Sequence, residues 1–258
     1  MSRIITRRRF LIGSTLTASA LGLSGCDAPV ESPKVQSILK IAEGLTMKTQ
    51  RALIGDDTLA REFTMADISP TFRANGTRMP DGAQYQDLLS RKFSTWQLEV
   101  GGLVVRPTKL SLAALKAMSS RTQITRHDCV EGWSAIGQWT GVPLGAVLNK
   151  VGLKPEARYI AFHCADEYEK TLDGSGWYYE SIDLVDAFHP QTILAHSMNG
   201  RDLEVPHGAP LRLRVERQLG YKQAKYLMRI EAVADLSGLY GGNGGFWEDR
   251  GYEWYAGI

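Results

Sequence analysis

Residues 125–134 constrain the fold most, because a single cysteine stands there among polar, charged and aromatic neighbours, directly after a strand-like stretch. Ile124 and Thr125 lead into the segment with the β-branched character that favours strands. A strand end holds its residues rigidly, so a thiolate at Cys129 is well placed to bind a metal or attack a substrate. A lone cysteine is also commonly a small buried hydrophobic residue or half of a disulfide. The segment alone leaves these interpretations open.

Length and composition fit one globular domain with a sizeable core. The chain has 258 residues, of which 43% are hydrophobic. Four of its 30 basic residues and none of its 28 acidic residues lie in residues 1–26, which leaves 26 basic against 28 acidic residues afterwards. A remainder so near neutrality gives no reason to expect a nucleic-acid partner. No apolar run of membrane-spanning length follows residue 26, and three cysteines are too few for a disulfide scaffold.

Residues 1–26 resemble an export signal. Three arginines followed by Phe-Leu at 7–11 open a short apolar run, a pattern similar to a twin-arginine signal. Leu-Ser-Gly-Cys at 23–26 resembles a lipobox, and Asp27 resembles an inner-membrane retention signal. We therefore expect a periplasmic protein that is lipid-anchored to the inner membrane through Cys26. An ordinary secretory signal, or cleavage without lipidation, is the alternative.

The rest of the chain predicts an α+β domain. Residues 27–62 read as a tether and a helix with an apolar stripe expected to pack on the domain, and residues 63–258 as the domain itself. Strands are predicted at 96–100, 157–164, 192–198, 202–205, 211–215 and 226–233, and helices at 111–118 and 143–151. Asn199-Gly200 predicts a type I′ hairpin turn, and Ser111 and Asp183 are expected to cap short helices.

Residues 126–134, together with Trp-Thr-Gly-Val-Pro-Leu at 139–144, resemble the molybdopterin domain of the sulfite oxidase family. They are most similar to its bacterial branch, which includes catalytic subunits of periplasmic methionine-sulfoxide reductases. The match runs from about Phe72 to the C-terminus. It implies a sulfite-oxidase-type fold of mixed sheets with short helices over residues 63–258. It also implies a molybdenum–molybdopterin cofactor with a single pterin dithiolene, whose metal is bound by Cys129.

The same resemblance implies a set of cofactor-binding residues: Asn75, Cys129, Cys164, His207, Arg212, Gln223, Ala224 and Lys225. His207 and Arg212 fall on an asparagine and an arginine that contact the cofactor in the family, and residues 223–225 fall on its phosphate-binding segment. Arginine can bind phosphate with two hydrogen bonds. Without the resemblance, the charges at 211–217 and 220–225 would read as solvated faces of a strand and a turn. A Cys129–Cys164 disulfide stays open, since the periplasm is oxidising.

Two further residues are candidates for catalysis. His127 lies two positions before Cys129, and such residues share one face of a strand, so His127 is expected to act as a proton donor or to support the metal site. Arg126 is a candidate for binding a substrate anion. None of the five histidines forms the spacing of a zinc hydrolase site.

The expected activity is oxygen-atom transfer by a molybdopterin-dependent oxidoreductase. Reduction of a sulfoxide or N-oxide, on a small-molecule or methionine-sulfoxide-type substrate, is the first expectation; a sulfite dehydrogenase or a non-catalytic lipoprotein with this fold are the alternatives. The chain has no haem-attachment motif and no iron–sulfur cysteine set, so a haem-b membrane subunit is expected as electron partner. A monomer is expected, because no dimerisation domain follows the core. The aromatic tail, residues 241–258, is either a wrap on the domain or part of a substrate mouth.

Overall fold

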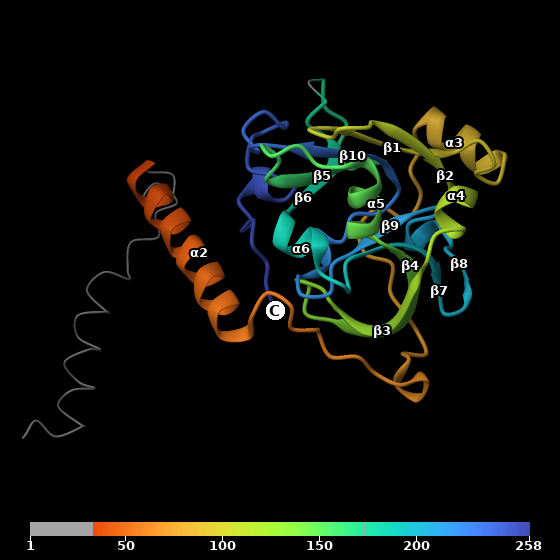
Figure 1. The fold of residues 1–258 in the computed structure, drawn as a ribbon, viewed down its shortest axis with the longest axis horizontal. Helices are drawn as coiled ribbons and strands as arrows, with labels where there is room; N and C mark the ends of the chain where they lie inside the picture. Colours follow the sequence, from red (N-terminus) through yellow and green to blue (C-terminus); the bar gives the residue numbers. More distant parts are fainter. Residues whose placement is uncertain (1–32, 173) are drawn as a thin grey trace, which may run out of the picture. The chain divides into compact units, whose positions relative to one another are not determined.

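The computed structural model describes residues 33–172 and 174–258 (Figure 1). The chain divides into two compact units, Met1–Lys48 and Thr49–Ile258. Helix α2 (Pro33–Ile54) begins in the first unit and ends in the second. The arginine motif, the lipobox and Cys26 lie outside the described residues, and the packing of the helix stripe on the domain stays a prediction. No helix within the described ranges combines the length and apolarity needed to cross a membrane.

One five-stranded sheet forms half of the second unit. Its order is β2 (Thr108–Ser111), β1 (Gln97–Gly102), β10 (Leu227–Val233), β5 (Tyr159–Glu167) and β6 (Trp177–Asp183). β1 and β10 pair in parallel, and the other neighbours are antiparallel. Leu98 and Val100 alternate inward from β1, as the sequence predicts for a half-buried strand. Phe162 of β5 is fully buried as well, in a strand whose residues are covered on both faces.

A second sheet carries the cysteine segment. Its order is β3 (Arg121–Asp128), β4 (Ser134–Pro143), β7 (Ile193–Met198) and β8 (Arg201–Asp202), and β9 (Arg212–Arg214) pairs with β7. β3 and β4 form a hairpin whose loop holds Cys129. The predicted β7–β8 turn is confirmed, because Asn199 and Gly200 both have positive φ, 48° and 75°, as a type I′ turn requires.

Short helices cover the sheets: α3 (Ala83–Ser90), α4 (Leu112–Lys116), α5 (Leu144–Val151) and α6 (Leu184–Phe188). Single 3₁₀ turns lie at η1 (Met65–Asp67), η2 (Val205–His207), η3 (Gly220–Lys222) and η4 (Glu248–Arg250). Ser111 and Asp183 cap α4 and α6 through their side chains, as predicted. The helix expected to open at Pro143 begins one residue later, and the strand expected at 202–205 is only β8 followed by η2. The prediction of an α+β domain with more strand than helix is confirmed.

One hydrophobic core joins the two sheets. Leu98, Phe162 and Ile230 reach it from the five-stranded sheet, while Val142 and Leu213 reach it from the second sheet. The core fixes both sheets relative to one another within the second unit. Loops from the two sheets therefore meet in a defined geometry, and the cysteine loop lies among them.

Candidate cofactor site

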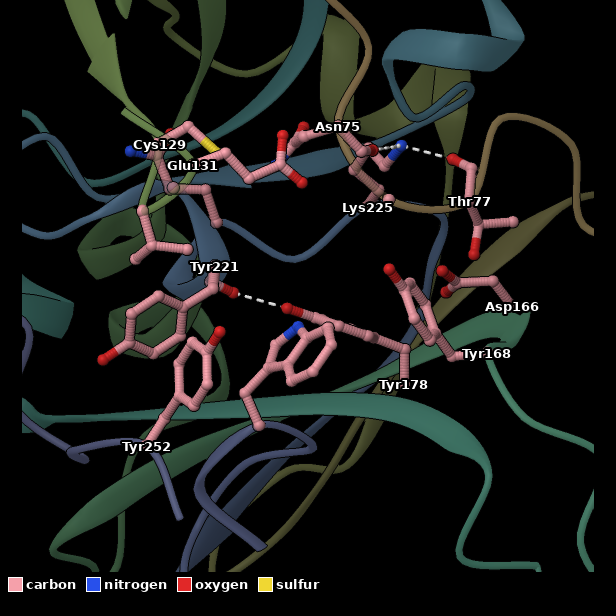
Figure 2. A pocket seen from close by; sticks show the side chains of 15 residues that line it. Asn75, Thr77, Cys129, Glu131, Asp166, Tyr168, Tyr178, Tyr221, Lys225 and Tyr252 are labelled. Atoms are coloured by element: carbon pink, nitrogen blue, oxygen red, sulfur yellow. Dashed lines mark hydrogen bonds between the residues drawn. The ribbon is translucent and has the colours of Figure 1, made fainter. Parts of the chain in front are cut away.

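A cavity of about 150 Å³ lies between the β3–β4 loop, η3 and the end of β5 (Figure 2). Its two sides differ in chemistry. Figure 2 shows Cys129, Glu131 and Asn75 along one side and tyrosines along the other. The cavity thus offers a sulfur ligand and polar groups opposite a wall of aromatic rings.

Cys129 sits in a tight turn rather than in the strand itself. The Cys129 N–H donates to the Trp133 carbonyl, and the Gly132 N–H donates to the Cys129 carbonyl, each at 3.0 Å. Partial burial raises the pKa of the Cys129 thiol above its usual range, and the Glu131 carboxylate adds to this, whereas the N–H groups of Glu131 and Val130 lower it. The bare site therefore favours the thiol, and a bound metal cation would supply the positive charge that stabilises the thiolate.

His127 is fully buried next to this turn. Its Nδ1 lies 3.1 Å from an Arg214 N–H, and since arginine can only donate, Nδ1 accepts and Nε2 carries the proton. Burial, followed by the charges of Arg214 and Arg212, holds the pKa of His127 well below its usual range. A Cβ on Gly220 would lie 2.5 Å from Nε2, so glycine is needed for this approach. A side-chain hydrogen bond with Gln223 acts against burial and these charges and raises the pKa of His127.

Basic side chains are buried behind the cavity without enough negative charge to balance them. Arg214 forms a two-point ion pair with Glu216, at 2.9 and 2.5 Å. Arg212 bonds only to carbonyl oxygens, at 3.0 Å to His207 and 3.2 Å to Gln223, and no carboxylate of residues 33–172 or 174–258 forms an ion pair with it. Burial and the neighbouring Arg214 lower the pKa of Arg212 to about 9. An anion bound here would relieve this repulsion.

Lys225 has a different arrangement from the predicted phosphate contact. Its ammonium group donates to the carbonyls of Asn75, Thr77 and Pro206, at 2.6, 2.5 and 3.1 Å. Burial and the charge of Arg212 lower the pKa of Lys225 to about 7. Because a lysine has three N–H donors, these bonds occupy all of them. Lys225 therefore fixes the loop that carries Asn75, and contributes positive charge rather than a free donor.

Unpartnered polar atoms surround the cavity. Three side chains next to it hold a buried atom of this kind: Asp166, His207 and Arg212. Buried polar atoms in folded proteins normally have partners, so this concentration indicates a polar ligand. Together with the unbalanced basic charge and the Cys129 sulfur, it fits molybdopterin, which presents a phosphate, a hydrogen-bonding pterin and a metal.

Most of the predicted residues come together at this site. Asn75, Cys129, Gln223 and Lys225 line the cavity, and His127, His207 and Arg212 are packed around it. Ala224 is buried, and its carbonyl accepts from the Leu213 N–H at 2.8 Å, which ties the segment to β9. Cys164 does not line the cavity and is buried in β5, beside the charges of Asp166 and Lys225. Both Cys129 and Cys164 are free thiols, so the structure does not contain the alternative disulfide.

Arg126 is the candidate that the structure does not bring to the cavity. The alternation of β3 directs His127 inward and Arg126 outward, where its side chain pairs with Asp128 at 2.9 Å and is 56% exposed. Cys129 follows the end of β3, so the face shared by His127 and Cys129 comes from the turn and not from strand alternation.

Asp166 is a site residue that the sequence reasoning missed. It is almost fully buried and lines the cavity, and burial raises its pKa to about 6, against the lowering effect of Lys225 and of the Thr77 hydroxyl. The predicted strand ended at Cys164, whereas β5 continues to Glu167, so no signal in the sequence pointed to Asp166. Aromatic rings also line the cavity, among them Trp247 and Tyr252 of the tail. For these the sequence offered only the alternative that the tail forms part of a substrate mouth.

The chain is similar to known molybdopterin-binding proteins. The family described as "Oxidoreductase molybdopterin binding domain" matches residues 86–239. YedZ1 of Azospira oryzae, named as a subunit of a protein-methionine-sulfoxide reductase, is 36% identical over 97% of this chain and 87% of its own. The protein-methionine-sulfoxide reductase catalytic subunits MsrP of Xanthomonas axonopodis pv. citri and Pseudomonas syringae pv. tomato are 34% and 31% identical, over 89% and 90% of this chain and 70% and 73% of theirs.

Among solved structures, the sulfane dehydrogenase SoxCD from Paracoccus pantotrophus is similar to 54% of this chain and 38% of its own, with 22% identity and a TM-score of 0.48. The family match and the sequence relatives confirm the predicted oxidoreductase, its α+β molybdopterin-binding fold and its molybdenum–molybdopterin cofactor. The chain belongs to the sulfite oxidase family of molybdopterin-binding oxidoreductases.

Proposed function

We propose that this protein reduces a sulfoxide to its thioether by oxygen-atom transfer, acting on a methionine-sulfoxide-type substrate. The observation that carries the proposal is the Cys129 sulfur in a cavity backed by buried, unbalanced basic residues. The names of the sequence relatives support reduction over sulfite oxidation. The net reaction consumes two electrons and two protons and releases the substrate oxygen as water.

The residues present divide the work among themselves. When bound, the cofactor supplies a metal that exchanges an oxygen atom and two electrons. Cys129 would bind that metal, and Arg212 would hold the anionic phosphate deeper in the core. His127 holds a proton on Nε2 at the edge of the site, available as a hydrogen-bond donor. Lys225 fixes the loop of Asn75 and Thr77 at the cavity, where these residues would contact the cofactor.

Electrons for the reaction would come from another protein. MsrP relatives are catalytic subunits, which implies a partner subunit. Within residues 33–172 and 174–258, no cluster of three His, Cys, Asp or Glu side chains could hold a further metal. We propose a haem-b membrane subunit as the partner, on the basis of the resemblance described above.

We also propose that the protein is periplasmic and anchored to the inner membrane through Cys26. The arginine motif at 7–11 and the lipobox-like residues 23–26 support this. A bacterial lipoprotein carries more than one acyl chain, which suffices for stable attachment. The anchor would raise the effective concentration of the enzyme beside a membrane partner. Cys26→Ser should then keep viologen-driven activity but slow quinol-driven reduction by membranes; equal quinol-driven rates would contradict the anchor's role.

The central experiment uses protein purified from the periplasm after export. We expect a molybdenum content close to one atom per chain. With reduced benzyl viologen as electron donor, methionine sulfoxide and dimethyl sulfoxide should be reduced, and sulfite with ferricyanide should react slowly by comparison. Protein produced without the cofactor serves as control. Fast sulfite oxidation without sulfoxide reduction would overturn the proposed function.

A further inference from the structure

The C-terminal tail forms part of the cavity wall. Trp247 and Tyr252 line the cavity together with Tyr168, Tyr178 and Tyr221. Figure 2 shows the labelled tyrosines on the side that faces Cys129, Glu131 and Asn75. These five rings are called the aromatic wall below. A ligand held next to the Cys129 sulfur would therefore meet rings on its other side.

The rings of the wall pack against one another as a continuous surface. Trp247 stacks on Tyr252 with ring centroids 5.2 Å apart and an angle of 29° between planes. Tyr221 contacts Tyr252 edge-on at 5.3 Å, and Tyr168 contacts Trp247 edge-on at 5.5 Å. The Tyr178 hydroxyl donates to the Tyr221 carbonyl at 2.6 Å. Edge-on and stacked pairs of this kind hold each ring in one orientation.

The two residues that follow Trp247 fasten the tail to the domain, so the wall is a fixed surface. Glu248 is buried and accepts from the Lys222 ammonium group, which also lies 2.6 Å from Glu180. Asp249 accepts from the Tyr179 hydroxyl at 2.5 Å and from the Gly241 N–H at 3.0 Å. Neither carboxylate faces the cavity, yet both determine where Trp247 lies. A fixed apolar surface can select ligands by shape and polarity.

We propose that Trp247 and Tyr252 are specificity-determining residues that bind the methyl–sulfur end of the substrate. The inference rests on the proposed sulfoxide reduction and adds how the substrate is chosen. Sulfur attached to alkyl groups contacts aromatic rings favourably. The sulfoxide oxygen would then point to the polar side with Cys129. An inorganic oxyanion has no apolar end, so the wall would strip its hydration without compensation. Glu131, on the polar side, adds repulsion of anions.

The first test separates binding from turnover in the holoenzyme. Trp247→Leu and Tyr252→Leu should each raise KM for N-acetylmethionine sulfoxide amide by about two- to tenfold and leave kcat nearly unchanged. Trp247→Phe keeps a ring and should stay close to wild type. Tyr240→Leu is the matched control, because Tyr240 is a partly exposed aromatic residue preceding the same tail that does not line the cavity. An unchanged KM in both leucine variants would overturn the proposal.

The second test reads recognition without turnover. N-acetylmethionine amide, the thioether product, and N-acetylnorleucine amide, in which a CH₂ replaces the sulfur, are titrated into the holoenzyme by calorimetry. Wild type should bind the thioether more tightly, and Trp247→Leu should remove the difference. Equal binding of both compounds to wild type would also overturn the proposal. If instead wild type binds the thioether selectively but reduces no sulfoxide, the proposed function fails while the recognition by the wall stands.

Discussion

Cys129 depends on its turn for its chemistry, since the turn exposes the sulfur to the cavity and offers two backbone N–H groups to a developing thiolate. Arg212 is the complementary case, because its buried Nε has no hydrogen-bond partner in the described structure, as expected of a group that binds a ligand. At the scale of single residues, the site is thus prepared for a metal on one side and an anion on the other.

Cys129→Ser should remove molybdenum and activity together. An alcohol is a harder and less acidic ligand than a thiol, so the loss should exceed the about 10–100-fold effect of changes that only support a metal site. Molybdenum content and viologen-coupled turnover are measured on the same preparation. Cys164→Ser is the control, because this cysteine does not line the cavity and serine preserves its size; it should keep most of its metal. A serine variant at 129 with full metal content would contradict the assignment.

Lys225 should make the cofactor-free protein more stable as the pH rises. Its pKa is lowered to about 7 in the folded protein from 10.5, so between these values the unfolded chain binds more protons than the folded one. The free energy of unfolding should therefore increase from pH 7 to pH 9. Urea denaturation at three pH values checks this. Lys225→Met should show a flatter dependence, and an identical slope would contradict the lowered pKa.

At the scale of elements, η3 connects the cofactor site to the tail. Gly220 at its start packs against His127, Lys222 at its end joins Glu180 and Glu248, and residues 223–225 continue into the cavity. All three groups of this ion cluster are buried. Burial and the neighbouring Glu248 raise the pKa of Glu180 well above its usual range, and Lys222 acts in the opposite direction.

The buried Glu180–Lys222–Glu248 cluster should contribute several kcal/mol to the free energy of unfolding. Lys222→Met would leave two carboxyl groups buried without their cation, which typically costs about 3–5 kcal/mol. Lys109→Met is the matched control, because Lys109 pairs with Glu99 at the surface, where an ion pair contributes at most about 1 kcal/mol. Denaturant midpoints of both variants, each compared with wild type, measure the two losses of stability. Similar midpoints would show that the buried cluster contributes no more than a surface pair.

Local patterns predicted the elements better than the site. Asn199-Gly200, Ser111 and Asp183 act within a few residues of themselves, so their turn and caps are readable in sequence. The cofactor residues were predicted because the chain resembles a family, and spacing alone would have left them as charged surfaces. The Glu180–Lys222–Glu248 cluster was missed, and only the tail's share of the aromatic wall was anticipated, as one of two alternatives, since each joins segments far apart in the chain. Asp166 was missed because β5 extends beyond the predicted strand and is buried on both faces there.

At the scale of the whole molecule, the cavity forms where loops of two sheets meet over a shared core. The basic residues behind it lower the stability of the cofactor-free protein, because Arg212 is buried without an ion-pair partner in the described chain. After binding, the same charge contributes to holding the phosphate. Stability of the empty protein and affinity for the cofactor are therefore opposed.

Arg212→Met should separate these two quantities. Replacing a buried, unpaired charge with an apolar side chain of similar length is expected to stabilise the cofactor-free protein by about 1 kcal/mol, or raise its Tm by about 2–4 °C. The same variant should gain less from the cofactor, because the phosphate loses a charge-assisted partner worth ~1.5–3 kcal/mol. Melting curves of the empty and loaded forms, with Arg201→Met as an exposed control, measure both. If the empty variant melts lower while its gain from the cofactor equals that of wild type, Arg212 is a structural residue and the phosphate is held elsewhere.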